Sequence, residues 1–297
     1  MRASTPHRPR DAALVLLGCA ALLGGWHLWA AGHPAVLVPS PAETWHALAR
    51  LAGDGLLTAE IGRTLGRTAL ASALALLVGV AWGLLGGWYR VADGVGRPLR
   101  ALLLGVPPII PVVMGMIWWG TGSGVPVFVA TLVSVPIVAV GVAEAVRSLD
   151  ADLLEMAAAF RIGAAQRLRH LVLPSLSAPL LAAVALVTTT SLRTTVMAEL
   201  LAAHDGVGAR IAEARTVLAT DEVFAWAAAT VAVALLVEHL LVGPLRRRAD
   251  GTRSDRTDAP TPTPPEHPAV PEKTAPPNQP TPPEQPTPPQ RAVHRTP

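Results

Sequence analysis

Residues 155–174 read EMAAAFRIGAAQRLRHLVLP, a charged and alanine-rich segment that lies between two long apolar stretches. The apolar stretches cover residues 125–143 before the segment and residues 175–198 after it. Each is close to the roughly 20 residues that a helix needs to cross a bilayer. The segment therefore has the character of a loop that joins two membrane-spanning helices.

Working outward, the chain contains six apolar stretches of about this length. It is 51% hydrophobic and only 15% charged, and its mean hydropathy is +0.42. That composition is typical of a protein that lives in a bilayer. The sequence predicts an all-α, polytopic membrane protein with about six transmembrane helices. The expected spans are Ala12–Gly32, Thr68–Tyr89, Ala101–Gly120, Val125–Ala143, Ser175–Ala198 and Val223–Leu245.

The arginines between the spans predict the orientation. With the N-terminus inside, the inner segments up to residue 248 hold thirteen arginines and the outer segments hold five. Cytoplasmic loops of membrane proteins carry such an excess of basic residues. Trp26 and Trp29 then lie at the outer end of the first helix, at the headgroup level that tryptophan prefers. We expect both termini in the cytoplasm and the chain in the cytoplasmic or inner membrane.

The two ends of the spanning region have distinct compositions. Residues 33–68 are too charged to span, and Ser40-Pro41 followed by Glu43 is a helix start signal. This predicts an amphipathic helix at the outer face. From Ala249 the chain becomes rich in proline, with 15 of its 29 prolines after that point, which is typical of a disordered tail. The tail is either a docking peptide of the PxxP type or a solvated tail without a partner.

The segment between the fourth and fifth spans has the features of a rigid knob. Asp150 can cap a helix that carries Glu155 near its positive end. Ala157 and Ala158 add little bulk, so such a helix can fit into a cleft of a partner protein. Gly163 suits a left-handed helix stop. An ordinary amphipathic loop is the alternative.

This segment resembles the EAA motif of binding-protein-dependent permeases, the membrane subunits of ABC importers. In that family the motif docks into the ATP-binding subunit. One departure is visible: the family's glycine usually falls six residues after the glutamate, where this chain has Arg161, and Gly163 follows two residues later. The resemblance assigns ATPase docking to Glu155, Ala157, Ala158, Gly163, Leu173 and Pro174.

Four further fragments resemble the permease branch that serves aliphatic sulfonates, taurine, nitrate and thiamine-precursor pyrimidines. They are VPSPAETW (38–45), VPPIIPVVMGMIWWGTGSG (106–124), VRSLDADLLEMA (146–157) and VMAELLAAHDGVGARIAEA (196–214). The resemblance covers roughly residues 35 to 245 and implies a permease fold of the type I importers. It also implies a homodimer with two ATPase subunits and an outer solute-binding protein. ATP would be bound by the partner subunit.

These observations predict three regions: a cytoplasmic N-terminus (1–11), a transmembrane permease domain (12–248) whose coupling loop covers 150–174, and a disordered cytoplasmic tail (249–297). The expected function is translocation of a small solute, such as a sulfonate, taurine or nitrate. An ion-coupled secondary transporter is the alternative.

The fifth span is unusually polar, and polar groups at membrane depth commonly mark a pathway or a pairing site. Arg193 would suit an oxyanion if it faces a water-filled path. Otherwise it forms an ion pair with Glu199 or Glu144, or extends to the interface. Some of the neighbouring threonines are expected to bond back to their own helix. The candidate path residues are Thr190, Arg193, Thr194 and Glu199.

Prolines in the third and fourth spans predict kinked helices around a pore. Proline breaks the backbone hydrogen-bond ladder, and this is tolerated where protein or a cavity surrounds the chain. The prolines concerned are Pro107, Pro108, Pro111, Pro126 and Pro136. Gly206-Val207-Gly208 is a weak turn signal that lacks the lysine of a phosphate loop.

Catalytic chemistry finds little support in the sequence. No nucleotide-binding, HExxH or GxSxG motif is present, and a single cysteine excludes an internal disulfide. An intramembrane enzyme would have only Arg193, Glu238 and His239 to work with. We expect no catalytic residue, cofactor or metal, and no nucleic-acid partner. Membrane lipid is the expected surrounding.

Overall fold

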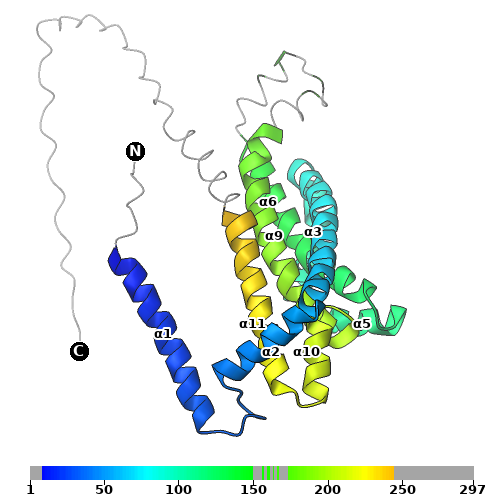
Figure 1. Ribbon diagram of the computed structural model, residues 1–297. Coiled ribbons are helices and arrows are strands. Elements are labelled where there is room, and N and C mark those ends of the chain that lie inside the picture. Colours follow the sequence, from blue (N-terminus) through cyan, green and yellow to red (C-terminus); the bar gives the residue numbers. More distant parts are fainter. Residues whose placement is uncertain are drawn as a thin grey trace, which may run out of the picture. The chain divides into compact units, whose positions relative to one another are not determined.

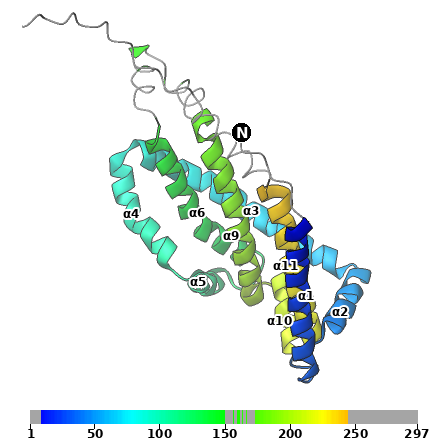
Figure 2. The ribbon, with the colours of Figure 1, turned by 90° about the vertical axis from the view of Figure 1, so that its left-hand side faces the viewer.

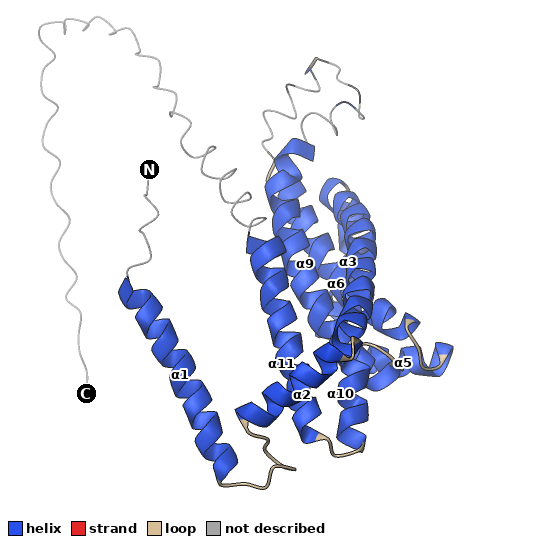
Figure 3. Cartoon of the chain, viewed as in Figure 1, coloured by secondary structure: helices blue, strands red, loops and turns tan. Residues whose placement is uncertain are grey.

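The structure is a computed structural model that describes residues 9–149 and 173–243, together with residues 156, 159, 160, 163 and 166. Every regular element in these ranges is helical, as predicted (Figure 3). The helices are α1 (Pro9–Ala31), α2 (Pro41–Gly53), α3 (Leu56–Trp88), α4 (Arg90–Gly105), α5 (Ile109–Trp119), α6 (Gly124–Arg147), α9 (Leu173–Ala202), α10 (Val207–Thr216), α11 (Thr220–Val237) and a π-helix, η2 (Glu238–Val242).

Three long helices, α3, α6 and α9, form the centre of the bundle (Figure 1). Their common core contains Ala75 of α3, Val138 and Val142 of α6, and Val187 of α9, all of them buried. The short helices α2 and α10 lie together at one end, which we call the α10 end. At the opposite end, α3 and α6 finish and α9 begins.

Glycines allow α3 and α6 to pack closely. Gly79, Gly83 and Gly87 recur every four residues along α3, and each faces a valine of α6. A Cβ placed on Gly79 would lie 2.5 Å from that of Val138, and one on Gly83 would lie 2.6 Å from that of Val142. Small residues at this spacing are typical of close helix contacts in membranes.

A bulkier residue in this contact should force the two helices apart. We expect Gly83→Val to destabilise the protein by about 1–3 kcal/mol, because overpacking shifts backbone that has no room to move. Thermal unfolding of the purified protein in detergent measures the loss. Gly62→Val on the same helix is the control, since a Cβ there meets no atom within 4 Å. Equal melting temperatures for the two variants would contradict the role assigned to Gly83.

The described helices agree with a polytopic membrane protein. Four of them are long and apolar enough to cross a bilayer, with spans at Leu56–Trp88, Gly124–Arg147, Leu176–Ala202 and Thr220–Leu240. The apolar part of α1, Leu16–Ala31, is shorter. Trp26 of α1 contacts the α10 end. Its indole N–H donates to the carbonyl of Pro39, just before α2, at 3.1 Å, and its ring stacks on Phe224 of α11.

The third expected span, Ala101–Gly120, is not one continuous helix. It is divided into α4 and α5, which meet at an angle of 96° (Figure 2). Pro107 and Pro108 cause the break, because proline lacks an N–H and disfavours helical backbone in the residue before it. Val106 is accordingly extended, with φ −78° and ψ 123°. The predicted kink is confirmed here, whereas α6 continues without a break through Pro126 and Pro136.

The second expected span begins earlier than predicted. α3 starts at Leu56 rather than Thr68 and has 33 residues, which is about 50 Å at 1.5 Å per residue. The charged stretch before Thr68 is therefore α2 plus the first turns of α3. The predicted start of α2 is confirmed: Glu43 N–H donates to Ser40 Oγ at 3.2 Å, and Ser40 N–H donates to Glu43 Oε2 at 2.7 Å. The hydrogen bonds that the Glu43 carboxylate accepts from the N–H and the hydroxyl of Ser40 hold its pKa below its usual range.

Candidate functional site

Six charged side chains gather at the α10 end and form what we call the ionic cluster. Three are acidic and three are basic, so their charges balance. They come from the first turns of α3, the end of α9, the turn after it and the start of α10. The members are Glu60, Arg63, Arg67, Glu199, Asp205 and Arg210.

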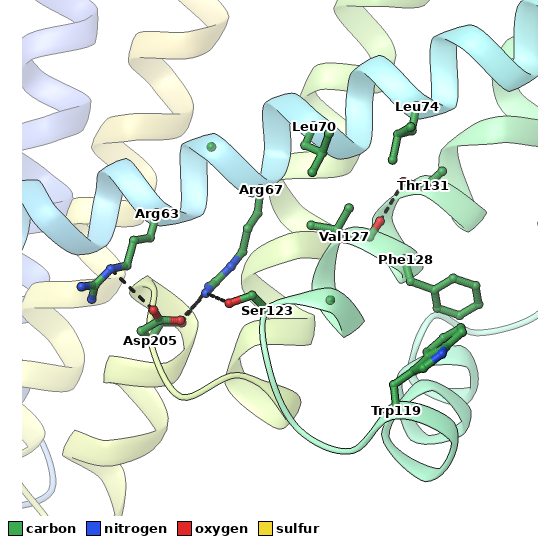
Figure 4. A pocket seen from close by; sticks show the side chains of 12 residues that line it. Arg63, Arg67, Leu70, Leu74, Trp119, Ser123, Val127, Phe128, Thr131 and Asp205 are labelled. Atoms are coloured by element: carbon green, nitrogen blue, oxygen red, sulfur yellow. Dashed lines mark hydrogen bonds and ion pairs between the residues drawn. The ribbon is translucent and has the colours of Figure 1, made fainter.

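Arg67 occupies the centre of the ionic cluster (Figure 4). Its Nη1 lies 2.7 Å from Glu199 Oε1 and 2.8 Å from the carbonyl oxygen of Asp205. Its Nη2 donates to Ser123 Oγ at 2.6 Å and to the carboxylate of Asp205. The side chains of Arg67 and Glu199 are 9% and 0% exposed. One guanidinium thus joins α3, α9, the turn after α9 and the residue before α6.

Two acids of the ionic cluster, Glu60 and Glu199, accept hydrogen bonds from the backbone at the start of α10. The N–H of Gly206 donates to Glu60 Oε2 at 2.6 Å, and that of Gly208 donates to Glu199 Oε2 at 3.2 Å. The first N–H groups of a helix have no partner within the helix and favour negative charge. Gly206 has φ +97°, and a Cβ there would lie 2.5 Å from the Glu199 carboxyl carbon. The Gly206-Val207-Gly208 stretch, interpreted as a weak turn signal, is therefore the start of a helix, and its first position requires glycine.

Ionisation of two partly buried members, Asp205 and Arg210, favours the cluster at neutral pH. The hydrogen bond from Arg67 holds the pKa of the Asp205 carboxyl below its usual range. The hydrogen bond to Glu60 raises the pKa of Arg210. Both groups are therefore charged at neutral pH, and their ion pairs are in place.

A cavity of about 980 Å³ adjoins the ionic cluster. Arg63, Arg67 and Asp205 form one end of it, and Figure 4 shows these groups turned toward one another. The remaining wall is mainly apolar and comes from α3, α5 and α6. Because the charged groups satisfy one another, the cavity offers little net charge to a solute. Its wall residues are Leu70, Leu74, Trp119, Val127, Phe128 and Thr131.

The predicted path residues on α9 divide into two groups. Thr190, Arg193 and Thr194 share one side of the helix, since residues three and four apart are neighbours. Glu199 comes six residues after Arg193 and so lies about 120° away around the axis, at 3.6 residues per turn. Within the described part of the chain, none of the four lines the cavity.

The environments of these residues also differ. Arg193 is exposed, Thr190 is half-buried, and Thr194 and Glu199 are buried. The alternative prediction of an ion pair between Arg193 and Glu199 is wrong, because Glu199 pairs with Arg67. Among the described residues, Arg193 forms no ion pair. Two threonines do bond back to their own helix, at Thr188 and Thr189.

The predicted docking residues fall mostly outside the described part of the chain. Glu155, Ala157 and Ala158 lie outside it, as does the tail. Gly163 is exposed and lies in no helix. Leu173 and Pro174 are the first residues of α9.

Comparison with known proteins decides the family. Residues 75–243 match the family described as the binding-protein-dependent transport system inner membrane component. The chain belongs to this family. Its permeases are multi-pass subunits of ABC importers in the inner membrane. ATP is bound by a separate ATPase subunit, and a binding protein delivers the solute. The chain is therefore a pore subunit without a cofactor, and the alternatives of an ion-coupled transporter and an intramembrane enzyme are wrong.

Several permeases are similar to this chain over most of their length. A probable ABC transporter permease of Brucella melitensis is 26% identical over 79% of this chain and 95% of that protein. The taurine transport system permease TauC of Escherichia coli is 28% identical over 68% and 76%. The riboflavin transport system permease RibX of Chloroflexus aurantiacus is 30% identical over 73% and 80%.

Solved structures support the permease fold. The methionine ABC transporter MetNI in an inward-facing conformation matches with a TM-score of 0.52. The match has 17% identity and covers 69% of this chain and 97% of that chain. At this identity the likeness concerns the fold alone. The expected type I importer architecture is therefore confirmed.

Proposed function

We propose that this permease translocates a small oxyanion, such as a sulfonate, taurine or nitrate, along the side of α9 that carries Thr190, Arg193 and Thr194. The observation that carries the proposal is the exposed guanidinium of Arg193 within a span. Guanidinium binds oxyanions through paired N–H donors. The similarity to a taurine permease supports an oxyanion as the solute. The similarity to a riboflavin permease supports a neutral solute as the competing proposal.

The position of Arg193 along α9 favours a dimer in which this side of the helix faces a second copy of the permease. It lies nine residues before the end of α9, which is about 14 Å along the axis at 1.5 Å per residue. A hydrocarbon core is about 30 Å thick, and an arginine near its centre costs about 3 kcal/mol or more if it faces lipid. Leu186, Met197 and Leu201 are exposed on the same side of α9. We infer that this side meets a water-filled path between two copies in a homodimer.

The proposed orientation places the α10 end outside and both termini in the cytoplasm. The excess of arginines in the segments predicted to lie inside supports it. α6 ends and α9 begins at the opposite end of the bundle, so the two helices that flank residues 150–172 meet the cytoplasmic side in this orientation. In this proposal, the coupling loop docks the ATPase through Glu155, Ala157, Ala158, Gly163, Leu173 and Pro174, residues 1–11 are cytoplasmic, and residues 249–297 form a cytoplasmic tail.

Arg193→Ala should lower solute uptake by about tenfold or more, because a hydrogen bond between charged groups contributes about 1.5–3 kcal/mol. Uptake of labelled taurine, ethanesulfonate and nitrate is measured in vesicles that hold the permease, its ATPase and its binding protein. Arg193→Lys keeps the charge but loses the paired donors, so it should be intermediate.

Two results would contradict different parts of this proposal. Unchanged uptake by Arg193→Ala, with normal assembly, would exclude Arg193 from the path. Failure of the wild-type transporter to take up any of the three anions would exclude the solute class and leave the docking of the ATPase unaffected.

A further inference from the structure

A second cavity, of about 610 Å³, lies at the end of the bundle away from α10. It is formed where α3 ends, α4 begins and α6 ends. We call it the α4 pocket. It contains three arginines and one aspartate, which makes it strongly basic. Its lining residues are Gly86, Gly87, Trp88, Arg90, Asp93, Arg97 and Arg147.

Asp93 organises the arginines of the α4 pocket. Its Oδ1 lies 2.7 Å from Arg147 Nη2, and its Oδ2 lies 3.1 Å from Arg97 Nη2. Arg100, immediately behind the pocket, also donates to this carboxylate. Arg147 is further held by the carbonyl of Gly86 at 3.2 Å. One carboxylate cannot neutralise three guanidinium groups, so the array keeps a net positive charge.

The arginines retain donors for a further ligand. The side chains of Arg97 and Arg147 are 73% and 44% exposed. Among the residues that the structure describes, Arg90 has no ion-pair partner. Guanidinium groups held in this way suit phosphate, which accepts several N–H bonds at once.

An apolar stripe follows the α4 pocket along the same helix. Val91, Val95, Leu99 and Leu102 share one face of α4 and are 80%, 74%, 49% and 60% exposed. The opposite face is buried against α3 and α6 through Asp93 and Arg100. Figure 2 shows α4 alongside α6 at the edge of the bundle. Trp88 and Tyr89 flank the pocket and are exposed, as aromatic side chains at a membrane interface commonly are.

We propose that the α4 pocket binds the phosphate headgroup of an anionic phospholipid, with an acyl chain along the α4 stripe. Basic pockets between transmembrane helices on the cytoplasmic side suit such headgroups. A free phosphate shares the headgroup chemistry but leaves the stripe uncovered, so the adjoining apolar face favours the lipid. The bound lipid would join α4 to the last turn of α6, directly before the coupling loop.

The test uses the full chain in a nonionic detergent, and it needs neither ATPase nor solute. Phosphatidylglycerol should raise the melting temperature with a saturable dependence, because a ligand of the folded state stabilises it. Phosphatidylcholine with the same acyl chains, glycerol phosphate and inorganic phosphate should have little effect. Arg90→Gln with Arg97→Gln should raise the half-saturating lipid concentration about 30-fold, from the loss of two basic groups.

Two further variants serve as controls. Arg90→Lys with Arg97→Lys keeps both charges and should respond to phosphatidylglycerol within a few-fold of the wild type. Arg50→Gln with Arg215→Gln removes two exposed charges near the α10 end and should respond as the wild type does. Circular dichroism verifies the fold of each variant. If the glutamine pair fails to fold, the wild-type preference between the two phospholipids decides the question.

Three outcomes would overturn the proposal. An equal response to phosphatidylglycerol and phosphatidylcholine would exclude headgroup recognition. Saturation by inorganic phosphate or glycerol phosphate with the same stabilisation would identify a free phosphate site instead of a lipid site. An unchanged half-saturating concentration in the glutamine pair would exclude the α4 pocket.

Discussion

Arg67→Ala is expected to destabilise the permease by about 3–5 kcal/mol, because it leaves a buried carboxylate without its partner. Glu199 is fully buried and Arg67 is its ion-pair partner. The same substitution removes the bonds to Ser123 and to the turn at Asp205. Thermal unfolding in detergent and the yield of folded protein from membranes measure the effect.

Arg63→Ala is the matched control for this prediction. Arg63 belongs to the same cluster, but its side chain is 48% exposed, and exposed ion pairs contribute only about 0–1 kcal/mol. A double replacement, Arg67→Met with Glu199→Leu, should recover part of the stability because it removes both buried charges together. The prediction is wrong if the free energies of unfolding of Arg67→Ala and Arg63→Ala differ by less than about 1 kcal/mol.

Glu155→Arg with Ala158→Arg should abolish transport, to at least about 100-fold below the wild type, while the amount of permease stays the same. The two arginines would place bulk and positive charge in the proposed contact with the ATPase, and like or unpaired charges at an interface cost several kcal/mol. The measurement is co-purification of the ATPase from mildly solubilised membranes, together with uptake into vesicles.

The tail offers a control with the same chemistry. Asp258→Arg with Ala259→Arg also changes one acid and one alanine to arginine, in a segment to which we assign no role in binding the ATPase. That variant should retain the ATPase and normal uptake. Retention of the ATPase by the Glu155 and Ala158 variant would exclude this part of the chain as the docking contact.

Local features of the fold could be predicted from the sequence because their causes are local. Ser40 and Glu43 are three residues apart, so the capping contact that begins α2 is visible in the sequence. The break between α4 and α5 follows from the two adjacent prolines before Ile109. The close packing of the periodic glycines of α3 is absent from the sequence predictions, although their spacing of four residues is a usable signal.

The ionic cluster could not be predicted, because its partners are far apart in the chain. Arg67 is 132 residues from Glu199 and 138 residues from Asp205. From the sequence alone, Arg67 belongs to an outer segment and Glu199 to the candidate path with Arg193. Local patterns show that a charge occurs at membrane depth, but only the packing of α3 against α9 shows which charges meet.

The bonds of Arg67 limit how this chain can move. α3 and α9 cannot slide past each other without separating the buried ion pair of Arg67 and Glu199. Further bonds from the same guanidinium hold the turn after α9 and the residue before α6. The α10 end of each chain should therefore behave as one solid block, with no internal hinge among those segments. If the transporter alternates between two openings, as the proposed dimer requires, the motion must be a rotation of one whole bundle against the other. A disulfide placed across α3 and α9 within one chain should leave the rate of the cycle unchanged, whereas a crosslink between copies should stop it.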